Sequence, residues 1–140
     1  MTDAARPAVL FVDDERAVLE GFRDAFRREE FEVVTAESAL RALELLAAQP
    51  VDVVVSDECM ARISGAKFLA IVRERYPNIV RIMLTGEASL SAATRAINDG
   101  LYRFLSKPIE QDELRRVVRD ALKSKGVTEE RARLRLNQRT

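Results

Sequence analysis

Five short, mostly apolar runs alternate along the chain with longer stretches in which apolar residues recur every three or four positions. Each run is five or six residues long and is followed by a polar residue. Runs of this length, most of them rich in β-branched residues, are typical of strands buried in a parallel sheet. The predicted strands are Ala8–Val12, Phe31–Ala36, Val51–Val55, Val80–Leu84 and Leu101–Ser106.

The stretches between these runs have the spacing of amphipathic helices. In the second stretch, Ser38 is the predicted N-cap, and the predicted buried face is Leu40, Leu43, Leu46 and Ala47. We expect helices over Arg16–Glu30, from Ser38 to Pro50, over Ala66–Tyr76 and Leu90–Asp99, and a last one that buries Leu114, Val117, Val118, Ala121 and Leu122. Strands alternating with helices predict an α/β fold, in which helices cover both faces of a parallel sheet.

Length and charge predict one domain with a basic tail. The 140 residues are enough for a single substantial core. Basic and acidic residues balance at 23 each, so the bulk charge does not indicate nucleic-acid binding. From Ser124 onward, however, five basic residues stand against two acidic ones. We expect a lead-in over residues 1–7, a domain over 8–123, and a basic linker or C-terminal helix extension over 124–140.

Several features predict a cytoplasmic protein. The single cysteine, Cys59, excludes an internal disulfide and fits a reducing compartment. The sequence has neither an apolar run of membrane-spanning length nor a signal peptide. The basic tail lacks a reading helix or an aromatic platform, so we expect no direct contact with nucleic acid.

Polar residues at the strand ends form one set. Asp13 and Asp14 follow the first strand, Asp57 the third, Thr85 the fourth and Lys107 the fifth. Right-handed crossovers in a doubly wound sheet would place the first and third strands side by side, so three carboxylates would share a pocket. Two charges ~4 Å apart repel by about 4 kcal/mol at an effective dielectric of roughly 20, so the cluster must hold protons, a cation or both. Oxygen ligands without His or Cys favour Mg²⁺, with Mn²⁺ as the alternative.

The same edge of the sheet would suit a phosphoryl group. Lys107 adds a fixed cation and Thr85 a hydroxyl donor, both facing the predicted metal. An aspartate carboxylate can itself act as a nucleophile and form an acyl phosphate. A divalent ion, a lysine and a hydroxyl around the lone carboxylate of Asp57 would make a receptor for a phosphoryl group.

Asp13-Asp14, the lone Asp57, Thr85-Gly86 and Lys107-Pro108, in this order and at these intervals, resemble the receiver domain of two-component response regulators. The resemblance runs over roughly Pro7–Lys123. It implies a three-layer, doubly wound, flavodoxin-like (βα)5 fold with a five-stranded parallel sheet in the order 2-1-3-4-5. It also implies a cis peptide bond between Lys107 and Pro108.

Residue roles follow from the resemblance. Asp57 would accept a phosphoryl group from a phosphohistidine of a sensor histidine kinase or a phosphotransfer protein. The implied metal ligands are Asp13, Asp14, Asp57 and the backbone carbonyl of Cys59. Lys107 would pair with a phosphoryl oxygen, while Thr85 and Phe104 would form the switch. The protein would thus be a signalling domain rather than a turnover enzyme, with self-phosphorylation and self-dephosphorylation as its only chemistry.

The implied output is a surface formed by the fourth helix, fifth strand and fifth helix. It would contact an output domain or a partner protein, and activation could produce a homodimer. The run from Ile97 to Pro108 resembles receivers joined to cyclic-dinucleotide phosphodiesterase domains or kinase modules. The chain is accordingly expected to be either a stand-alone receiver or a piece of a longer protein.

The loop Glu58–Ser64 departs from the family pattern. It has Met60-Ala61 where the family usually has Met-Pro, and alanine frees φ and restores an N–H, so we expect a more mobile loop. Glu58 adds an acid beside Asp57, although its position one residue on can direct it away. Cys59 and Glu87, two residues beyond Asp57 and Thr85, would tune the lifetime of the acyl phosphate. Gly65 is predicted to be a flexible joint.

Two alternatives stay open. An aspartate-nucleophile Mg²⁺ phosphatase would use similar chemistry, but it would place its nucleophile on the first strand with a second acid two residues later. A degenerate receiver would act only as a protein-interaction module. Ala61 favours the degenerate receiver, whereas the intact Asp57, Thr85 and Lys107 argue against it.

Overall fold

The computed structural model describes residues 6–86 and 103–139. Its elements are β1 (Ala8–Val12), α1 (Arg16–Phe26), β2 (Glu32–Ala36), α2 (Ala39–Ala48), β3 (Val53–Asp57), α3 (Gly65–Arg75), β4 (Val80–Thr85), β5 (Arg103–Ser106) and α5 (Gln111–Arg139). The predicted helix Leu90–Asp99 and Glu87 lie outside the described residues, as do residues 1–5 of the lead-in and the first two residues of the last predicted strand.

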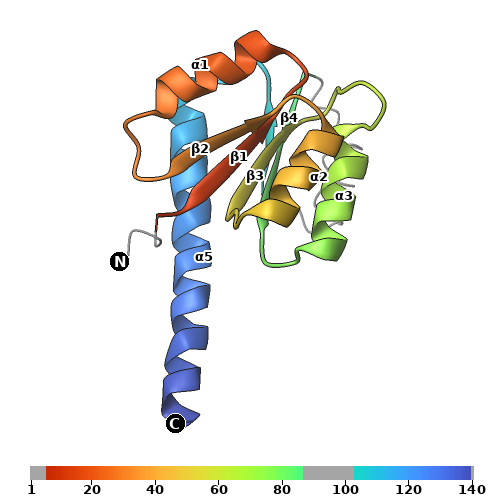
Figure 1. Cartoon of the computed structure of the whole chain (residues 1–140). Coiled ribbons are helices and arrows are strands. Elements are labelled where there is room, and N and C mark those ends of the chain that lie inside the picture. The colour runs from red at the N-terminus through yellow and green to blue at the C-terminus, as the bar shows by residue number, and fades with distance from the viewer. Residues whose placement is uncertain (1–5, 87–102, 140) are drawn as a thin grey trace.

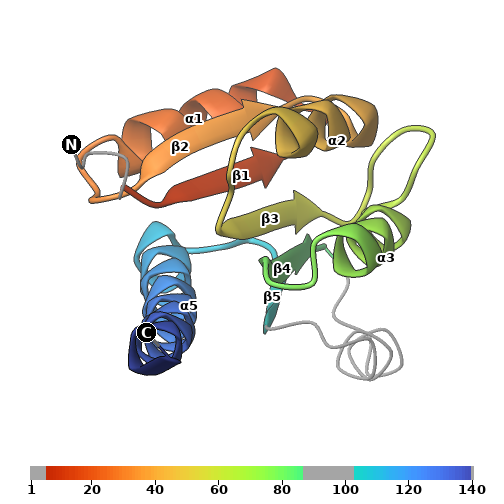
Figure 2. The same cartoon turned by 60° about the horizontal axis from the view of Figure 1, so that its bottom comes forward.

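The five strands form one parallel sheet in the order β2-β1-β3-β4-β5, which confirms the predicted fold. Helices cover both faces of this sheet (Figures 1 and 2). Alternate residues of each strand point to opposite faces. Val9 and Val55 pack with α1 and α5, whereas Leu10 and Val54 pack with α2 and α3. The inner strands β1 and β3 are therefore apolar on both faces, which explains their hydrophobic runs.

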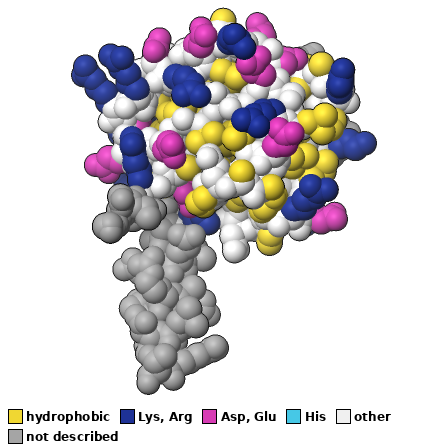
Figure 3. All heavy atoms as spheres, viewed as in Figure 1, with side chains coloured by type: hydrophobic (Ala, Val, Ile, Leu, Met, Phe, Trp, Pro, Cys, Tyr) yellow, Lys and Arg dark blue, Asp and Glu magenta, His cyan; other side chains and the backbone are white. Residues whose placement is uncertain are grey.

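The buried face of α2 differs from the prediction. Ala39, Ala42 and Leu46 are its buried residues, whereas Leu40 is 57% exposed and Ala47 is also exposed. Leu46 is buried as predicted, but the buried stripe passes through Ala39 and Ala42, one residue before the predicted Leu40 and Leu43. On the side of the molecule seen in Figure 3, hydrophobic side chains accordingly show at the surface over α2 and α3.

Two arginines of α5 hold the end of α1. The guanidinium of Arg115 binds the Glu29 carboxylate at 2.9 Å and lies 5.3 Å from the centre of the Phe26 ring. Arg119 binds the same carboxylate with two nitrogens, at 2.9 and 3.0 Å. The Glu29 side chain is 11% exposed, so its charge is largely removed from water and depends on these partners.

Glu29→Gln is therefore expected to lower the free energy of unfolding by about 2 kcal/mol, because two arginines lose their counter-charge in a partly buried site. Urea unfolding followed by circular dichroism measures the change. Glu30→Gln, at an exposed neighbouring position, removes the same charge and is the matched control. Equal effects of the two substitutions would contradict the role of Glu29.

Helix α5 runs without a break from Gln111 to Arg139 and extends well beyond the sheet (Figure 1). It continues across the predicted boundary between the domain, 8–123, and the basic linker or helix extension, 124–140; that boundary stays a prediction. Near this point the Lys125 ammonium lies 3.3 Å from the Asn78 carbonyl and 3.9 Å from the Asp52 carboxylate. Asp52 also accepts a hydrogen bond from the Ala8 N–H, so this contact joins α5 to the edge of the sheet where the strands begin.

Candidate functional site

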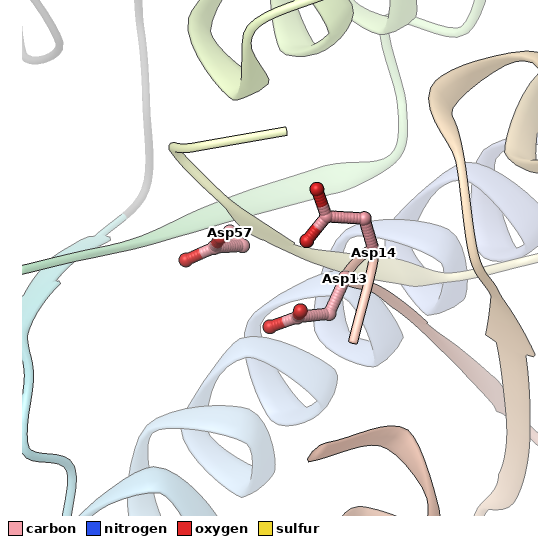
Figure 4. Close-up of side chains that lie close together, drawn as sticks. All are labelled: Asp13, Asp14 and Asp57. Atoms are coloured by element: carbon pink, nitrogen blue, oxygen red, sulfur yellow. The ribbon is translucent and has the colours of Figure 1, made fainter. Parts of the chain in front are cut away.

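Adjacent strands bring three carboxylates together. In the pairing of β1 with β3, Val12 lies opposite Ser56, so Asp13 and Asp57 leave the sheet at the same edge. Carboxylate oxygens of Asp13, Asp14 and Asp57 all lie within 4.8 Å of one another. Figure 4 shows Asp57 close to the two acids that follow β1. The structure thus assembles the predicted cluster.

Asp13 is the most constrained of the three. It is 2% exposed, and its Oδ1 accepts a hydrogen bond from the Glu15 N–H at 2.9 Å. Its Oδ2 is buried and has no hydrogen-bond partner. Burial raises the pKa of Asp13; the Glu15 hydrogen bond opposes this shift, and the negative charge of Asp57 adds to it.

This arrangement fits a hard divalent cation. A buried, unpartnered carboxylate oxygen beside two further carboxylates is costly without a positive charge. Oxygen-only donor sets suit Mg²⁺ or Mn²⁺. Asp14, which is exposed, opens onto a hollow that is also lined by Glu58, Cys59, Met60, Ala61 and Ser64.

Lys107 reaches the same cluster from the end of β5. Its Nζ lies 2.5 Å from Oδ1 of Asp57, whose side chain is 7% exposed. Burial lowers the pKa of Lys107, but the hydrogen bond and charge of Asp57 outweigh it, so the pKa lies above its usual value. The ammonium is therefore charged at neutral pH. The Lys107–Pro108 peptide is cis, as predicted.

Thr85, at the end of β4, has a partner that we did not predict. The residue is fully buried, and its hydroxyl donates a hydrogen bond to a carboxylate oxygen of Glu58. Glu58 is not part of the three-carboxylate cluster, in line with the expectation that its side chain could point away. The β3–β4 register, in which Asp57 pairs with Leu84, would have indicated this neighbour.

The loop after Asp57 is tied to the cluster. The N–H of Ala61 donates a hydrogen bond to Asp14 Oδ2 at 3.2 Å. A proline at this position would lack this N–H, so the alanine allows a hydrogen bond that restrains the loop. Two residues later, the Ile63 N–H donates to the Ala61 carbonyl at 2.8 Å. Arg62, between them, has a φ of 74°. An i to i+2 hydrogen bond around such a residue is a γ-turn, which is strained for any side chain except glycine.

Arg62→Gly is expected to raise the free energy of unfolding by about 1 kcal/mol, because glycine adopts a positive φ without steric cost. Thermal unfolding of both proteins measures the difference. Arg62→Ala is the matched control, since it removes the same side chain but keeps the Cβ. If alanine stabilised the protein as much as glycine, the gain would not come from the backbone conformation.

Gly65, the first residue of α3, lies against the end of β3. A Cβ built at this position would lie 2.1 Å from the Asp57 carbonyl oxygen and 2.8 Å from Glu58 Cα. The Gly65 N–H also donates to the Glu58 carbonyl at 2.8 Å. The glycine therefore permits a close approach of two backbones. This contact explains the glycine at position 65, for which the sequence predicted a flexible joint.

Phe104 lies on β5 opposite Met83 and is partly buried against the core between the sheet, α2 and α3. Its role in a switch stays a prediction, as does the metal contact of the Cys59 carbonyl. Within the described parts of the chain, no helix is both long enough and apolar enough to cross a membrane.

Comparisons with known proteins agree with this geometry. The model of the response regulator receiver domain family matches residues 9–119. The chain is 40% identical to the hydrogenase transcriptional regulatory protein HoxA of Cupriavidus necator, over 94% of this chain and 27% of that protein. It is 35% identical to the transcriptional regulatory protein GlrR of Escherichia coli, over 91% of this chain and 29% of that protein. The chain thus spans less than a third of the length of these relatives.

Solved structures show the same similarity. The signal receiver domain of an HD domain-containing protein from Pseudomonas fluorescens is 35% identical with a TM-score of 0.82, over 87% of this chain and 98% of that one. A response regulator receiver domain protein from Clostridium thermocellum is 27% identical with a TM-score of 0.81, over 87% of this chain and 98% of that one.

Proposed function

The chain belongs to the response regulator receiver domain family, whose standard function in two-component signalling is phosphorylation on an aspartate, and we propose that Asp57 is the aspartate phosphorylated here. The observation that carries this assignment is the contact between Asp57 and Lys107, 2.5 Å apart at the edge of the carboxylate cluster. Asp57 is buried, stands at the end of a central strand and has a fixed cation beside it. Asp13 and Asp14 are less suited, because they are adjacent and both belong to the first strand end.

Asp13, Asp14 and Asp57, together with the Cys59 carbonyl, would hold Mg²⁺ or Mn²⁺. The unpartnered Oδ2 of Asp13 supports this assignment. A bound divalent ion would neutralise negative charge on the transferring phosphoryl group. Without such an ion, the negatively charged phosphoryl group would approach the carboxylates only at a high electrostatic cost.

The chemistry proposed for Asp57 is an in-line displacement. A carboxylate oxygen forms a bond to phosphorus while the bond from phosphorus to the histidine nitrogen of the donor breaks. The Lys107 ammonium, which is paired with Asp57 in this structure, would then pair with a phosphoryl oxygen and stabilise the negative charge that develops there. The domain is a signalling domain, and we propose that its covalent chemistry is limited to its own phosphorylation and dephosphorylation.

Incubation with acetyl phosphate and Mg²⁺, followed by intact mass measurement, tests the proposal. We expect a single phosphoryl adduct that needs Mg²⁺ and is absent from Asp57→Asn. Asp24→Asn, at an exposed position on α1, is the matched control and keeps the adduct. Steady release of phosphate from varied esters would favour the phosphatase alternative. An absence of any adduct would favour a protein-interaction module without phosphorylation.

A sensor histidine kinase or a phosphotransfer protein is the proposed phosphoryl donor. The proposed output surface is formed by the predicted fourth helix, β5 and α5, with Thr85 and Phe104 as the proposed switch. An output domain is supported by the relatives, which are transcriptional regulators more than three times as long as the matched part. Size-exclusion chromatography with beryllofluoride and Mg²⁺ would detect a proposed homodimer on activation. The single unpaired cysteine, Cys59, supports a cytoplasmic location.

A further inference from the structure

The pairing of β3 with β4 sets Glu58 beside Thr85. Asp57 lies opposite Leu84 in this parallel pair, so the two following residues, Glu58 and Thr85, are neighbours at the strand ends. Leu84 packs with α5, whereas Met83 packs with α2 and α3. By alternation, Thr85 and Glu58 point to the face opposite Asp57. Glu58 is thereby separated from the carboxylate cluster and directed at the hydroxyl.

The backbone of Glu58 is held on both sides. Its N–H donates to the Leu84 carbonyl at 2.8 Å, and its carbonyl accepts the Gly65 N–H at 2.8 Å. The close approach of Gly65 to Asp57 and Glu58 leaves this peptide little room to move. The partly buried Glu58 side chain starts from this fixed point, and its carboxylate accepts the hydrogen bond of the fully buried Thr85 hydroxyl.

A hydroxyl has one proton to donate. While the Thr85 proton points at Glu58, it cannot be donated to a phosphoryl oxygen on Asp57. A hydrogen bond to a carboxylate is among the stronger ones, so giving it up costs free energy that the phosphoryl group must supply. The two acceptors therefore compete for one donor.

We propose that Glu58 is a positioning residue that holds the Thr85 hydroxyl away from the phosphoryl group and so opposes the switched state; this inference rests on the proposed function of Asp57. In this proposal the Thr85 hydroxyl has two arrangements. The hydrogen bond to Glu58 stabilises one, and a hydrogen bond to the phosphoryl group stabilises the other. Removing the Glu58 carboxylate shifts the balance toward the arrangement that binds phosphoryl.

Binding of beryllofluoride, a non-covalent mimic of the phosphoryl group, tests the competition in the presence of Mg²⁺. Isothermal titration calorimetry gives the affinity of the wild type, Glu58→Ala and Glu58→Gln. We expect Glu58→Ala to bind about tenfold more tightly, the factor that corresponds to about 1.4 kcal/mol. Glu58→Gln keeps a neutral acceptor and gains less. Glu44→Ala, which removes an exposed carboxylate from α2, keeps the wild-type affinity.

A double-mutant cycle separates the hydroxyl from general charge repulsion. In a Thr85→Ala background, the gain from Glu58→Ala should disappear, because the contested donor is gone. The inference is overturned if Glu58→Ala and Glu58→Gln gain no affinity, or if the full gain persists without the Thr85 hydroxyl. A wild type that fails to bind beryllofluoride would overturn the proposed function and this inference together. Wild-type binding lost in Asp57→Asn, with no gain in the Glu58 variants, would overturn this inference alone.

Discussion

Gly65→Ala should lower the free energy of unfolding by about 3 kcal/mol, because the added Cβ has no room. It would lie 2.1 Å from the carbonyl oxygen of Asp57 and 2.8 Å from Glu58 Cα. Both are backbone atoms of a paired strand end, so neither can move aside cheaply. A shift of the β3 end that relieves the clash also displaces the Asp57 carboxylate, and a shift of α3 disturbs the loop that follows Asp57. Loss of acetyl phosphate labelling is therefore expected along with the loss of stability.

Urea unfolding and intact mass measurement test this expectation on one preparation. Gly21→Ala is the matched control, because it lies in α1 and its Cβ would meet no atom within 4 Å. Alanine favours a helix over glycine by about 1 kcal/mol, so Gly21→Ala should stabilise the protein. Opposite signs for the two substitutions are expected. A stabilising Gly65→Ala would mean that α3 does not approach β3 as closely as the structure shows.

Asp13→Asn should make the metal-free protein more stable at neutral pH, by about 2 kcal/mol, and weaken Mg²⁺ binding at least tenfold. The carboxylate is 2% exposed and shares a pocket with Asp14 and Asp57. Asparagine keeps an oxygen for the Glu15 N–H but removes one of three negative charges. The substitution should thus raise stability and lower metal affinity, because the Asp13 carboxylate destabilises the metal-free fold and is explained by metal binding.

The pH dependence has a definite sign. Burial raises the pKa of Asp13 above 3.8, so the folded protein holds this proton more tightly than the unfolded chain. The wild type therefore loses stability as the pH rises from about 3.8 through the folded pKa, and it keeps that loss at neutral pH. Asparagine has no such loss, so the two proteins should differ little at acid pH and most at pH 7.

Urea unfolding in EDTA, at pH 7 and in acid, measures the stability difference. Repeating the measurement in Mg²⁺ should stabilise the wild type much more than Asp13→Asn, because a ligand that binds only the folded state stabilises it by mass action. Glu15→Gln, an exposed acid two residues away, is the matched control. A metal-free Asp13→Asn that is no more stable than the wild type at pH 7 would contradict the charge cluster.

The fold class could be predicted because its signals are local. A strand that is buried on both faces has an unbroken apolar run such as Val53–Val55, and this run can be recognised without knowing which elements pack against it. Parallel strands end at one edge, so the residues after each run could be grouped into a site before any distance was known. The buried face of α2 was predicted one residue out of place, because the large apolar side chains of Leu40 and Leu43 outweighed Ala39 and Ala42 in the pattern, and periodicity alone does not show which of two neighbouring stripes faces the sheet.

The amino-acid sequence by itself determined the order of the described strands and helices along the chain, and it placed Asp13, Asp14, Asp57 and Lys107 at the ends of strands. These depend on periodicity and on which residue follows each strand. The tertiary structure alone decided that Glu58 accepts the Thr85 proton, since the two residues are 27 positions apart and meet through the register of β3 with β4. It also decided that Gly65 is required by contact with the Asp57 backbone. Both depend on the approach of separate elements to within hydrogen-bond or van der Waals distance, which no local pattern encodes.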